Sequence, residues 1–210
     1  MFDYMNIDLK NKANINLFDD FYNKILVSSF AKDQIENYEQ FLNNLNNKDS
    51  YFITLVLNKD EVVGGIIYDY LKQTNSGFIE YIAVKKDHTN NNIGSNLLNQ
   101  AISILNQKSD KKIDFLFCEL EQEINGKQPK HYFWQKFGFK KIDFDYIQPP
   151  LDDLKKPVFI MDFGYLSFVK TDKKITKQLL IDVLNEYYVD YIDNEYFIQC
   201  IGNIKKAKKI

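Results

Sequence analysis

The chain has 210 residues, of which 45% are hydrophobic, and this favours one soluble domain with enough apolar side chains for a core. Its formal net charge of −2 at pH 7 excludes the broad positive field that nucleic-acid binding requires. No run reaches the roughly 18 apolar residues of a membrane span, and the N-terminus lacks a signal-peptide core. We therefore expect a cytoplasmic protein without a nucleic-acid or membrane partner.

Cysteine and histidine are too rare here to build a metal site or a disulfide framework. Cys118 and Cys200 are the only cysteines, and Cys118 lies in an apolar run that is typical of a core residue. His88 and His131 are far apart in the sequence, so no metal is expected. The chain also contains no arginine, so any bound phosphate must be held by lysine, by hydroxyl groups or by backbone N–H groups.

The first half of the chain alternates between two periodicities. Residues 17–47 carry two apolar stripes at helical spacing. Residues 51–57 and 62–71 are predicted strands joined by a tight turn, and 77–84 is predicted as a third strand. A polar loop then leads into a predicted helix that ends near Leu105.

The second half continues with a predicted strand at 112–120 and a short helix at 130–138 that Gly138 ends. Two more strands are predicted at 139–147 and 157–169, separated by the stretch "QPPLDDLKK". This order predicts an α/β (α+β) fold, with a mixed, mostly antiparallel sheet, one parallel crossover and flanking helices.

The last part of the chain is predicted to differ from the sheet region. Residues 173–193 repeat apolar side chains at helical spacing, which predicts one amphipathic helix, and the basic end at 203–210 is expected to fray. We therefore divide the chain into a domain at 1–170 and a helical extension at 171–210. The extension either packs back on the domain or forms the surface of a homodimer.

The stretch "KKDHTNNNIGS" joins the third strand to the following helix. Asparagine tolerates a positive φ better than most residues other than glycine, and Gly94 is expected to supply a positive φ and room for a ligand. A strand, a loop and a helix N-terminus in this order present backbone N–H groups to an anion. The candidate anion-binding residues are Thr89, Asn90, Asn91, Asn92, Ile93, Gly94 and Ser95.

This segment resembles the GNAT superfamily of acetyltransferases, in which a strand, an [R/Q]-x-x-G-x-[G/A] motif and a helix hold the pyrophosphate of coenzyme A. In "TNNNIG", Thr89 takes the Arg/Gln position, Asn92 takes the position of the first glycine, and Gly94 matches the second small residue. The helix that follows, "SNLLNQAI", is similar to the family's "GxxLLxxA".

A second stretch, "FWQKFGFKK", resembles the family's "FYxKxGF", a short helix beside the pantetheine arm of coenzyme A. Phe133 and Lys136 match, as do the glycine and phenylalanine that follow, and Trp134 stands at the usual tyrosine position. The resemblance covers about residues 15–168 in the family's order of elements and implies the GNAT fold, with a splayed pair of parallel strands.

The resemblance implies direct transfer of an acetyl group from acetyl-CoA to a primary amine in a ternary complex. In the family, a backbone N–H of the strand before the pyrophosphate loop stabilises the tetrahedral oxyanion, here among Ile82, Ala83 and Val84. Holding both reactants in one site supplies much of the rate.

Glu80 is the first candidate for the base that deprotonates the amine, because some members of the superfamily carry a glutamate at the matching place. Glu119 is the second candidate, as a proton relay or as a holder of the substrate ammonium group. Trp134 replaces the tyrosine that acts as general acid in many members, which leaves Tyr146 as a candidate acid. Acidic side chains around the site favour a cationic acceptor. The alternative is a non-catalytic GNAT-fold module that binds acyl-CoA or a protein partner.

Overall fold

The computed structural model describes residues 2–8, 11–122, 131–150, 158–169, 174–208 and 210. The strands follow the order β1-β2-β3-β4-β5-β7-β6 in a mixed sheet, and among the described strands β4 and β5 are the parallel pair. The chain divides into two compact units, residues 1–70 with 79–110 and residues 71–78 with 111–210. Each unit is described separately below.

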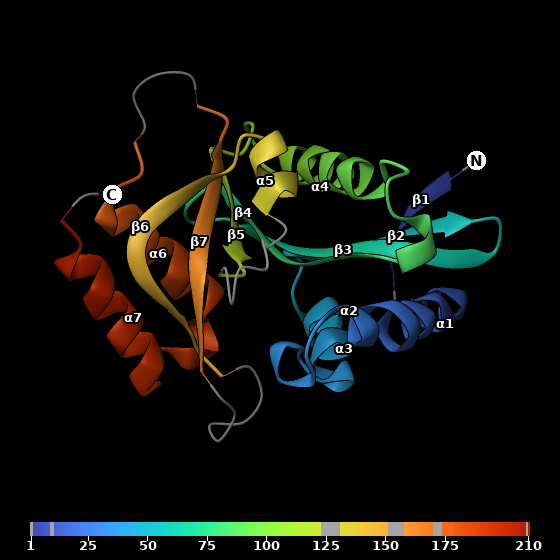
Figure 1. The fold of residues 1–210 in the computed structure, drawn as a ribbon, viewed down its shortest axis with the longest axis horizontal. Coiled ribbons are helices and arrows are strands. Elements are labelled where there is room, and N and C mark those ends of the chain that lie inside the picture. The colour runs from blue at the N-terminus through green and yellow to red at the C-terminus, as the bar shows by residue number, and fades with distance from the viewer. Residues whose placement is uncertain (1, 9–10, 123–130, 151–157, 170–173, 209) are drawn as a thin grey trace. The chain divides into compact units, whose positions relative to one another are not determined.

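The first unit contains three antiparallel strands and most of a fourth: β1 (Phe2–Asn6), β2 (Tyr51–Asn58), β3 (Glu61–Leu71) and β4 (Ser76–Val84). The helices α1 (Lys12–Phe21), α2 (Val27–Ser29) and α3 (Tyr38–Asn47) cover one face of these strands, whereas α4 (Ile93–Lys108) covers the other (Figure 1). A π-helical turn at Tyr22–Leu26 joins α1 to α2, and 3-10 turns lie at Lys32–Gln34 and Lys86–His88.

Apolar side chains at helical spacing on α1 and α3 explain how these helices pack on the strands. Phe18, Phe21 and Phe41 are fully buried, and the Phe41 ring lies edge-on to the Tyr81 ring of β4 at 5.6 Å. Asparagine side chains begin both helices, because an amide oxygen can accept a hydrogen bond from the first turn. The helical prediction for residues 17–47 is therefore correct, although residues 30–37, which include the 3-10 turn at Lys32–Gln34, separate α2 from α3.

The second unit contains β5 (Phe115–Leu120), β6 (Lys140–Gln148) and β7 (Phe159–Ser167), with β7 antiparallel to both of the others. Its helices are α5 (His131–Lys136), α6 (Lys177–Tyr187) and α7 (Glu195–Lys206), with a 3-10 turn at Val189–Tyr191. Figure 1 shows α7 running beside β6. The predicted loop at 151–156 lies outside the described residues.

Two elements differ from the expectation. The strand β1 was not predicted, because five residues without strict alternation give a weak strand pattern. The single helix expected at 173–193 ends at Tyr187, and a second helix, α7, includes residues that we expected to fray. The side chains of Phe197, Cys200 and Ile204 give α7 a buried stripe.

The helices α6 and α7 share a core with the strands of the second unit. Side chains from both helices are buried in one cluster with Phe115, Phe117 and Phe163 of β5 and β7. The helical members of this cluster are Leu180, Val183, Leu184, Phe197, Cys200 and Ile204. The division of the chain at residue 171 remains a prediction. The shared core shows that the helices of the predicted extension, α6 and α7, contact β5 and β7.

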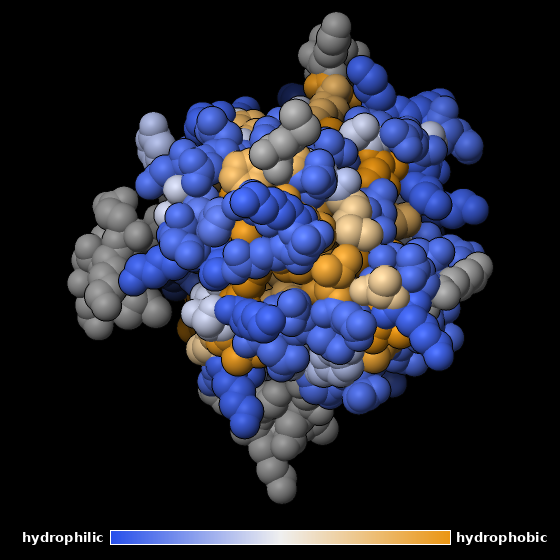
Figure 2. All heavy atoms as spheres, turned by 90° about the vertical axis from the view of Figure 1, so that its right-hand side faces the viewer, coloured by the Kyte–Doolittle hydropathy of each residue, from blue (hydrophilic) through white to orange (hydrophobic). Residues whose placement is uncertain are grey.

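Polar side chains predominate on the face of the molecule in Figure 2, where hydrophobic residues form smaller interrupted areas. None of the helices in the described part of the chain is long and apolar enough to cross a membrane.

We predict that the α7 stripe stabilises the second unit. Ile204→Ala should lower the free energy of unfolding by about 2–5 kcal/mol, because Ile204 is completely buried and its removal leaves a cavity. The matched control is Ile198→Ala on the same helix, whose side chain is 58% exposed and whose loss should change stability by less than about 0.5 kcal/mol. Urea unfolding measures both, and equal effects would contradict the packing of α7 on this core.

Candidate functional site

The loop between β4 and α4 contains two asparagines in the left-handed conformation. Asn90 has φ 68° and Asn92 has φ 59°, so the expectation of positive φ in this loop is confirmed for these two residues. The loop is braced internally, since Thr89 Oγ1 donates to the Lys86 carbonyl at 2.9 Å and Asn91 Nδ2 donates to the His88 carbonyl at 3.2 Å. Its backbone shape is therefore held by its own polar side chains.

The N-terminus of α4 presents unpaired backbone donors. Asn92 is the N-cap, and its side chain makes no capping hydrogen bond to any described residue. The first bond of the helix runs from the Asn96 N–H to the Asn92 carbonyl at 2.9 Å, so the N–H groups of Ile93, Gly94 and Ser95 have no acceptor one turn back. The positive end of a 16-residue helix dipole lies at these groups, and both features favour a bound anion.

Gly94 differs from the expectation in one respect. It is the second residue of α4 and does not have a positive φ, because the left-handed residue of this turn is Asn92. Gly94 can therefore contribute room for a ligand, whereas the change of chain direction depends on asparagine.

The lysines beside this loop have different surroundings. Lys85 Nζ forms an ion pair with Glu61 and lies 3.8 Å from Asp87, and these partners raise its pKa. Lys86 is exposed, and the structure gives its ammonium group no ion pair within the described residues. Both lysines line a hollow that Ser28, Ser29, Val84 and Asp87 complete.

The residues predicted to stabilise the oxyanion lie near the end of β4. Ile82 and Val84 are half-buried there, and Ala83 between them is buried.

Glu80 lies on β4 in the first unit and accepts a hydrogen bond from the Tyr51 hydroxyl at 3.0 Å. Burial raises the pKa of Glu80 well above its usual value, and the carboxylates of Glu36 and Asp69 raise it further. The Tyr51 hydrogen bond and the charge of Lys48 lower the pKa of Glu80, with less effect. Burial also raises the pKa of Tyr51, so its hydroxyl remains a donor.

Glu119 lies on β5 in the second unit and is the centre of a polar cluster. The hydroxyls of Tyr146 and Tyr188 both donate to Glu119 Oε1, the latter at 2.6 Å, and Gln148 Nε2 donates to Oε2 at 2.8 Å. The two hydroxyls lie 2.9 Å apart. Burial raises the pKa of Glu119, whereas both tyrosine hydrogen bonds lower it.

Burial, followed by the charge of Glu119, raises the pKa of Tyr146 well above its usual value. A phenol whose proton is held this strongly is a weak general acid, and the Tyr146 hydroxyl is already engaged with Glu119. The role of Tyr146 as a general acid stays a prediction, and the structure shows its hydroxyl bound to the Glu119 carboxylate.

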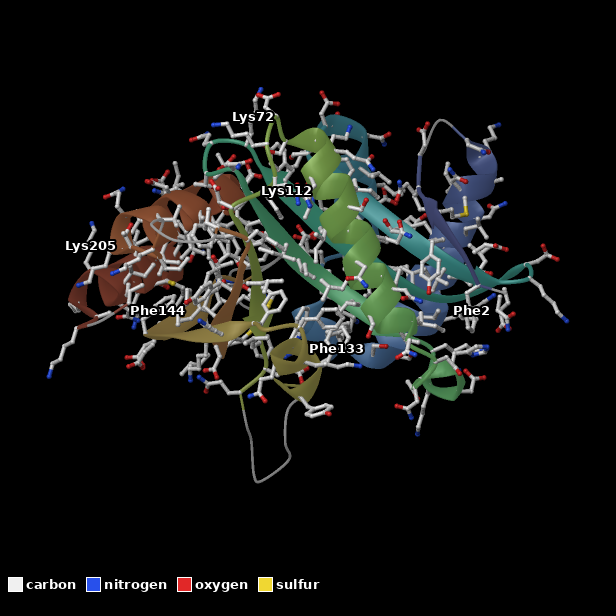
Figure 3. All side chains as sticks on the ribbon, turned by 90° about the horizontal axis from the view of Figure 1, so that it is seen from above. Phe2, Lys72, Lys112, Phe133, Phe144 and Lys205 are labelled. Atoms are coloured by element: carbon white, nitrogen blue, oxygen red, sulfur yellow. The ribbon has the colours of Figure 1, made fainter. Side chains whose placement is uncertain are left out.

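The helix α5 carries Phe133, Trp134 and Lys136, and Figure 3 labels Phe133. The Trp134 ring packs edge-on against Phe133 at 5.1 Å and against Phe139 at 4.9 Å. Lys136 is exposed. The predicted stop is confirmed, because Gly138 has φ 85° after the last turn of the helix.

The predicted site residues thus form four groups. In the first unit these are the loop with the end of β4, and Glu80. In the second unit they are Glu119 with Tyr146, and the α5 residues Phe133, Trp134 and Lys136. Three further polar residues were not predicted: Tyr51, Gln148 and Tyr188. Tyr188 belongs to the helical spacing of residues 173–193, which predicted an amphipathic helix but no hydrogen bond to a carboxylate. Nothing in the local pattern of Tyr51 or Gln148 pointed to a buried carboxylate. In the described part of the chain, no group of three or more His, Cys, Asp or Glu side chains could hold a metal ion.

We predict that Glu80 lowers stability at neutral pH. Its folded-state pKa is raised, so the folded state binds the proton more tightly, and stability is lost as pH rises from the unfolded-state pKa through the folded one. Glu80→Gln removes this charge, and its gain in unfolding free energy over the parent should grow between pH 5 and pH 8. Glu39→Gln, at an exposed position on α3, is the control and should follow the parent curve. A Glu80→Gln curve parallel to the parent would show that Glu80 is as well solvated as Glu39.

The sequence profile described as "Acetyltransferase (GNAT) family" matches residues 13–139. No curated protein matches the chain significantly.

Several solved structures share the fold. A protein described as a GNAT-family acetyltransferase from Bacteroides thetaiotaomicron has a TM-score of 0.65 at 17% identity, covering 89% of this chain and 97% of its own. The ribosomal-protein-S18-alanine N-acetyltransferase of Escherichia coli has a TM-score of 0.59 at 12% identity, with 83% and 99% covered. The PaiA N-acetyltransferase of Thermoplasma acidophilum, in complex with coenzyme A, has a TM-score of 0.54 at 14% identity, with 80% and 99% covered. Because the family profile spans more than half of the sequence, this chain belongs to the GNAT acetyltransferase family and is an acyltransferase.

Proposed function

We propose that the protein transfers an acetyl group from acetyl-CoA to a primary amine, by direct attack in a ternary complex. The observation that carries this proposal is the loop before α4, where Asn90 and Asn92 take positive φ and lead into a helix N-terminus with unpaired N–H groups. The complex of PaiA with coenzyme A supports the choice of acyl carrier.

The pyrophosphate of coenzyme A is assigned to the backbone N–H groups of Ile93, Gly94 and Ser95. The chain has no arginine, so a backbone cradle and the helix dipole supply most of the attraction. Exposed Lys86 is the cation that we assign to long-range attraction, because Lys85 is already paired with Glu61.

In the reaction that we propose, the acceptor enters as an ammonium ion and Glu80 takes one of its three protons. The amine nitrogen attacks the thioester carbonyl, and backbone N–H groups among Ile82–Val84 stabilise the oxyanion. The C–N bond forms and the C–S bond breaks. A second proton of the nitrogen passes to the thiolate sulfur, and the third stays on the amide. A thiol with a pKa of about 8.5 leaves readily, so no tyrosine acid is required.

A cationic acceptor fits the carboxylates near Glu80. Glu36 and Asp69 both act on the Glu80 pKa as negative charges, so an ammonium group entering this region would be attracted by three carboxylates. The alternative is a module of the same fold that binds acyl-CoA without turnover.

The function is tested by thiol release and by calorimetry. We expect micromolar binding of acetyl-CoA, and release of free thiol with at least one cationic amine in a panel of polyamines, aminoglycosides and peptides. Glu80→Gln should lower turnover by roughly 10²–10⁴ with little change in affinity for coenzyme A. Binding without thiol release on any amine would favour the module, and absence of binding at millimolar acetyl-CoA would overturn the proposal.

The loop is tested separately through its backbone conformation. Asn92→Val should weaken coenzyme A binding roughly tenfold or more, because a β-branched residue does not tolerate the positive φ at this position. Asn92→Gly should keep or improve affinity. Asn99→Val, at an exposed position of α4 outside the loop and without a positive φ, is the matched control and should bind nearly as the parent does. If Asn92→Val and Asn99→Val have the same dissociation constant by calorimetry, the loop does not hold the pyrophosphate.

A further inference from the structure

The second unit contains a hollow of about 460 Å³ at one end of the sheet face that α6 and α7 cover. Its described lining comes from β5, β6 and β7, from the two residues before the N-cap of α6, and from Ile210, which follows α7. Small-molecule sites in proteins have volumes of about 300–1,000 Å³, so the hollow is large enough for a ligand. None of its lining residues is among those that we assign to coenzyme A or to proton transfer.

The register of the strands places several lining residues on one face of the sheet. Lys140 of β6 lies opposite Tyr165 of β7, and Phe115 of β5 lies opposite Ser167 of β7. Opposed residues of antiparallel strands point to the same side of a sheet, as do residues two positions apart in one strand. These four side chains therefore share a face with Ile142, two residues after Lys140.

The apolar part of the lining is continuous with the hydrophobic core of the second unit. Phe115 and Ile142 are buried members of that core, and the Phe115 ring lies edge-on to the Tyr165 ring at 6.4 Å. Tyr165, Ile175 and Ile210 pack against the same core but are only half-buried. We call these five side chains the apolar floor. A ligand with an apolar body would remove the exposed parts of the floor from water, which is favourable.

The charged part of the lining has an excess of positive charge. Lys141 Nζ forms an ion pair with Asp162 at 2.8 Å, so its charge is already balanced. Lys140 and Lys174 are exposed, and neither ammonium group has an ion pair with a described residue. Asp143 is the one carboxylate among the described lining residues. Two unpaired ammonium groups against one carboxylate leave one positive charge, which a monoanion would balance.

The polar groups of the hollow select the kind of anion. Tyr165 and Ser167 add two hydroxyls, for which the described residues provide no hydrogen-bond partner. Ammonium and hydroxyl groups are donors, and a carboxylate accepts hydrogen bonds from both kinds. A polyphosphate would carry more negative charge than the lining can balance, and an entirely polar ion would leave the apolar floor in water. The combination fits a monocarboxylate with an apolar body.

We propose that this hollow binds a free alkyl monocarboxylate, of the chemical class of medium-chain fatty acid anions. Its carboxylate is bound by Lys140 and Lys174, and its chain lies on the apolar floor. Lysine suits this arrangement because its aliphatic stem can lie along apolar surface while its ammonium group meets the carboxylate. The site goes beyond the proposed function and does not rest on it.

The test is calorimetric titration of octanoate into the full chain, with an excess of coenzyme A present to occupy the acyl-carrier site. We expect a dissociation constant on the order of 0.1–1 mM, since the ligand is small. Octanamide has a similar chain without the charge and should bind at least about tenfold more weakly. Acetate has the charge without the chain and should not bind at the concentration that saturates the protein with octanoate.

Three variants locate the site. Lys140→Gln and Lys174→Gln should each weaken octanoate binding about three- to tenfold, because each removes one charged donor. Lys72→Gln is the matched control, since it removes the same charge from an exposed position of the same unit that does not line the hollow, and it should bind as the parent does. Ser167→Trp fills the hollow from an exposed position at the end of β7 and should abolish binding. Urea unfolding of each variant checks that its fold is kept.

Three results would overturn the proposal. The first is octanoate binding with the dissociation constant of Lys72→Gln in Lys140→Gln, Lys174→Gln and Ser167→Trp, because the site would then lie elsewhere. The second is equal affinity for octanoate and octanamide, because the lysines would then recognise nothing. The third is the absence of octanoate binding at many times the expected dissociation constant. The proposed function is unaffected by all three, since the titration involves no acceptor and no turnover.

Discussion

A carboxylate that leaves water must find hydrogen-bond donors inside the protein, because its desolvation costs several kcal/mol. In the second unit this constraint applies to Glu119, whose donors come from β6 and from the residue that follows α6. The carboxylate thus connects three segments that are far apart in the sequence. Apolar packing holds α6 and α7 against the strands. The Tyr188 hydroxyl adds one directional contact between the end of α6 and Glu119.

The buried carboxylate of the first unit, Glu80, has fewer hydrogen-bond donors than Glu119. Glu80 accepts one hydrogen bond, from the Tyr51 hydroxyl. Burial raises its pKa, and the negative charges of Glu36 and Asp69 raise it further. Such a group destabilises the folded state when it is ionised, and for the same reason it takes up a proton readily. Natural sites often retain this conflict between stability and reactivity, since selection requires only enough stability. This imbalance is the reason that we propose Glu80 as the base.

The loop before α4, to which we assign the pyrophosphate, illustrates how backbone groups can take the place of charged side chains. Family members with arginine and glycine in the loop combine a guanidinium with flexible backbone, whereas this chain has neither arginine nor the first glycine. Asn92 adopts the left-handed conformation that glycine usually takes, and the N–H groups of the next three residues remain unpaired within the helix. The helix dipole adds partial positive charge at the same place. Backbone geometry is thus kept while the side chains change.

The sequence by itself determined the features that depend on local chemistry. Apolar spacing predicted most of the helices and strands, the tolerance of asparagine for positive φ predicted the loop, and Gly138 predicted the end of α5. It also pointed to Glu80 and Glu119, without their partners. Only the tertiary structure decided that Tyr51 and Tyr188 donate to these glutamates and that β1 and α7 form. The physical reason is that periodicity and backbone propensity act over a few residues, whereas a contact between residues 69 positions apart depends on how whole elements pack.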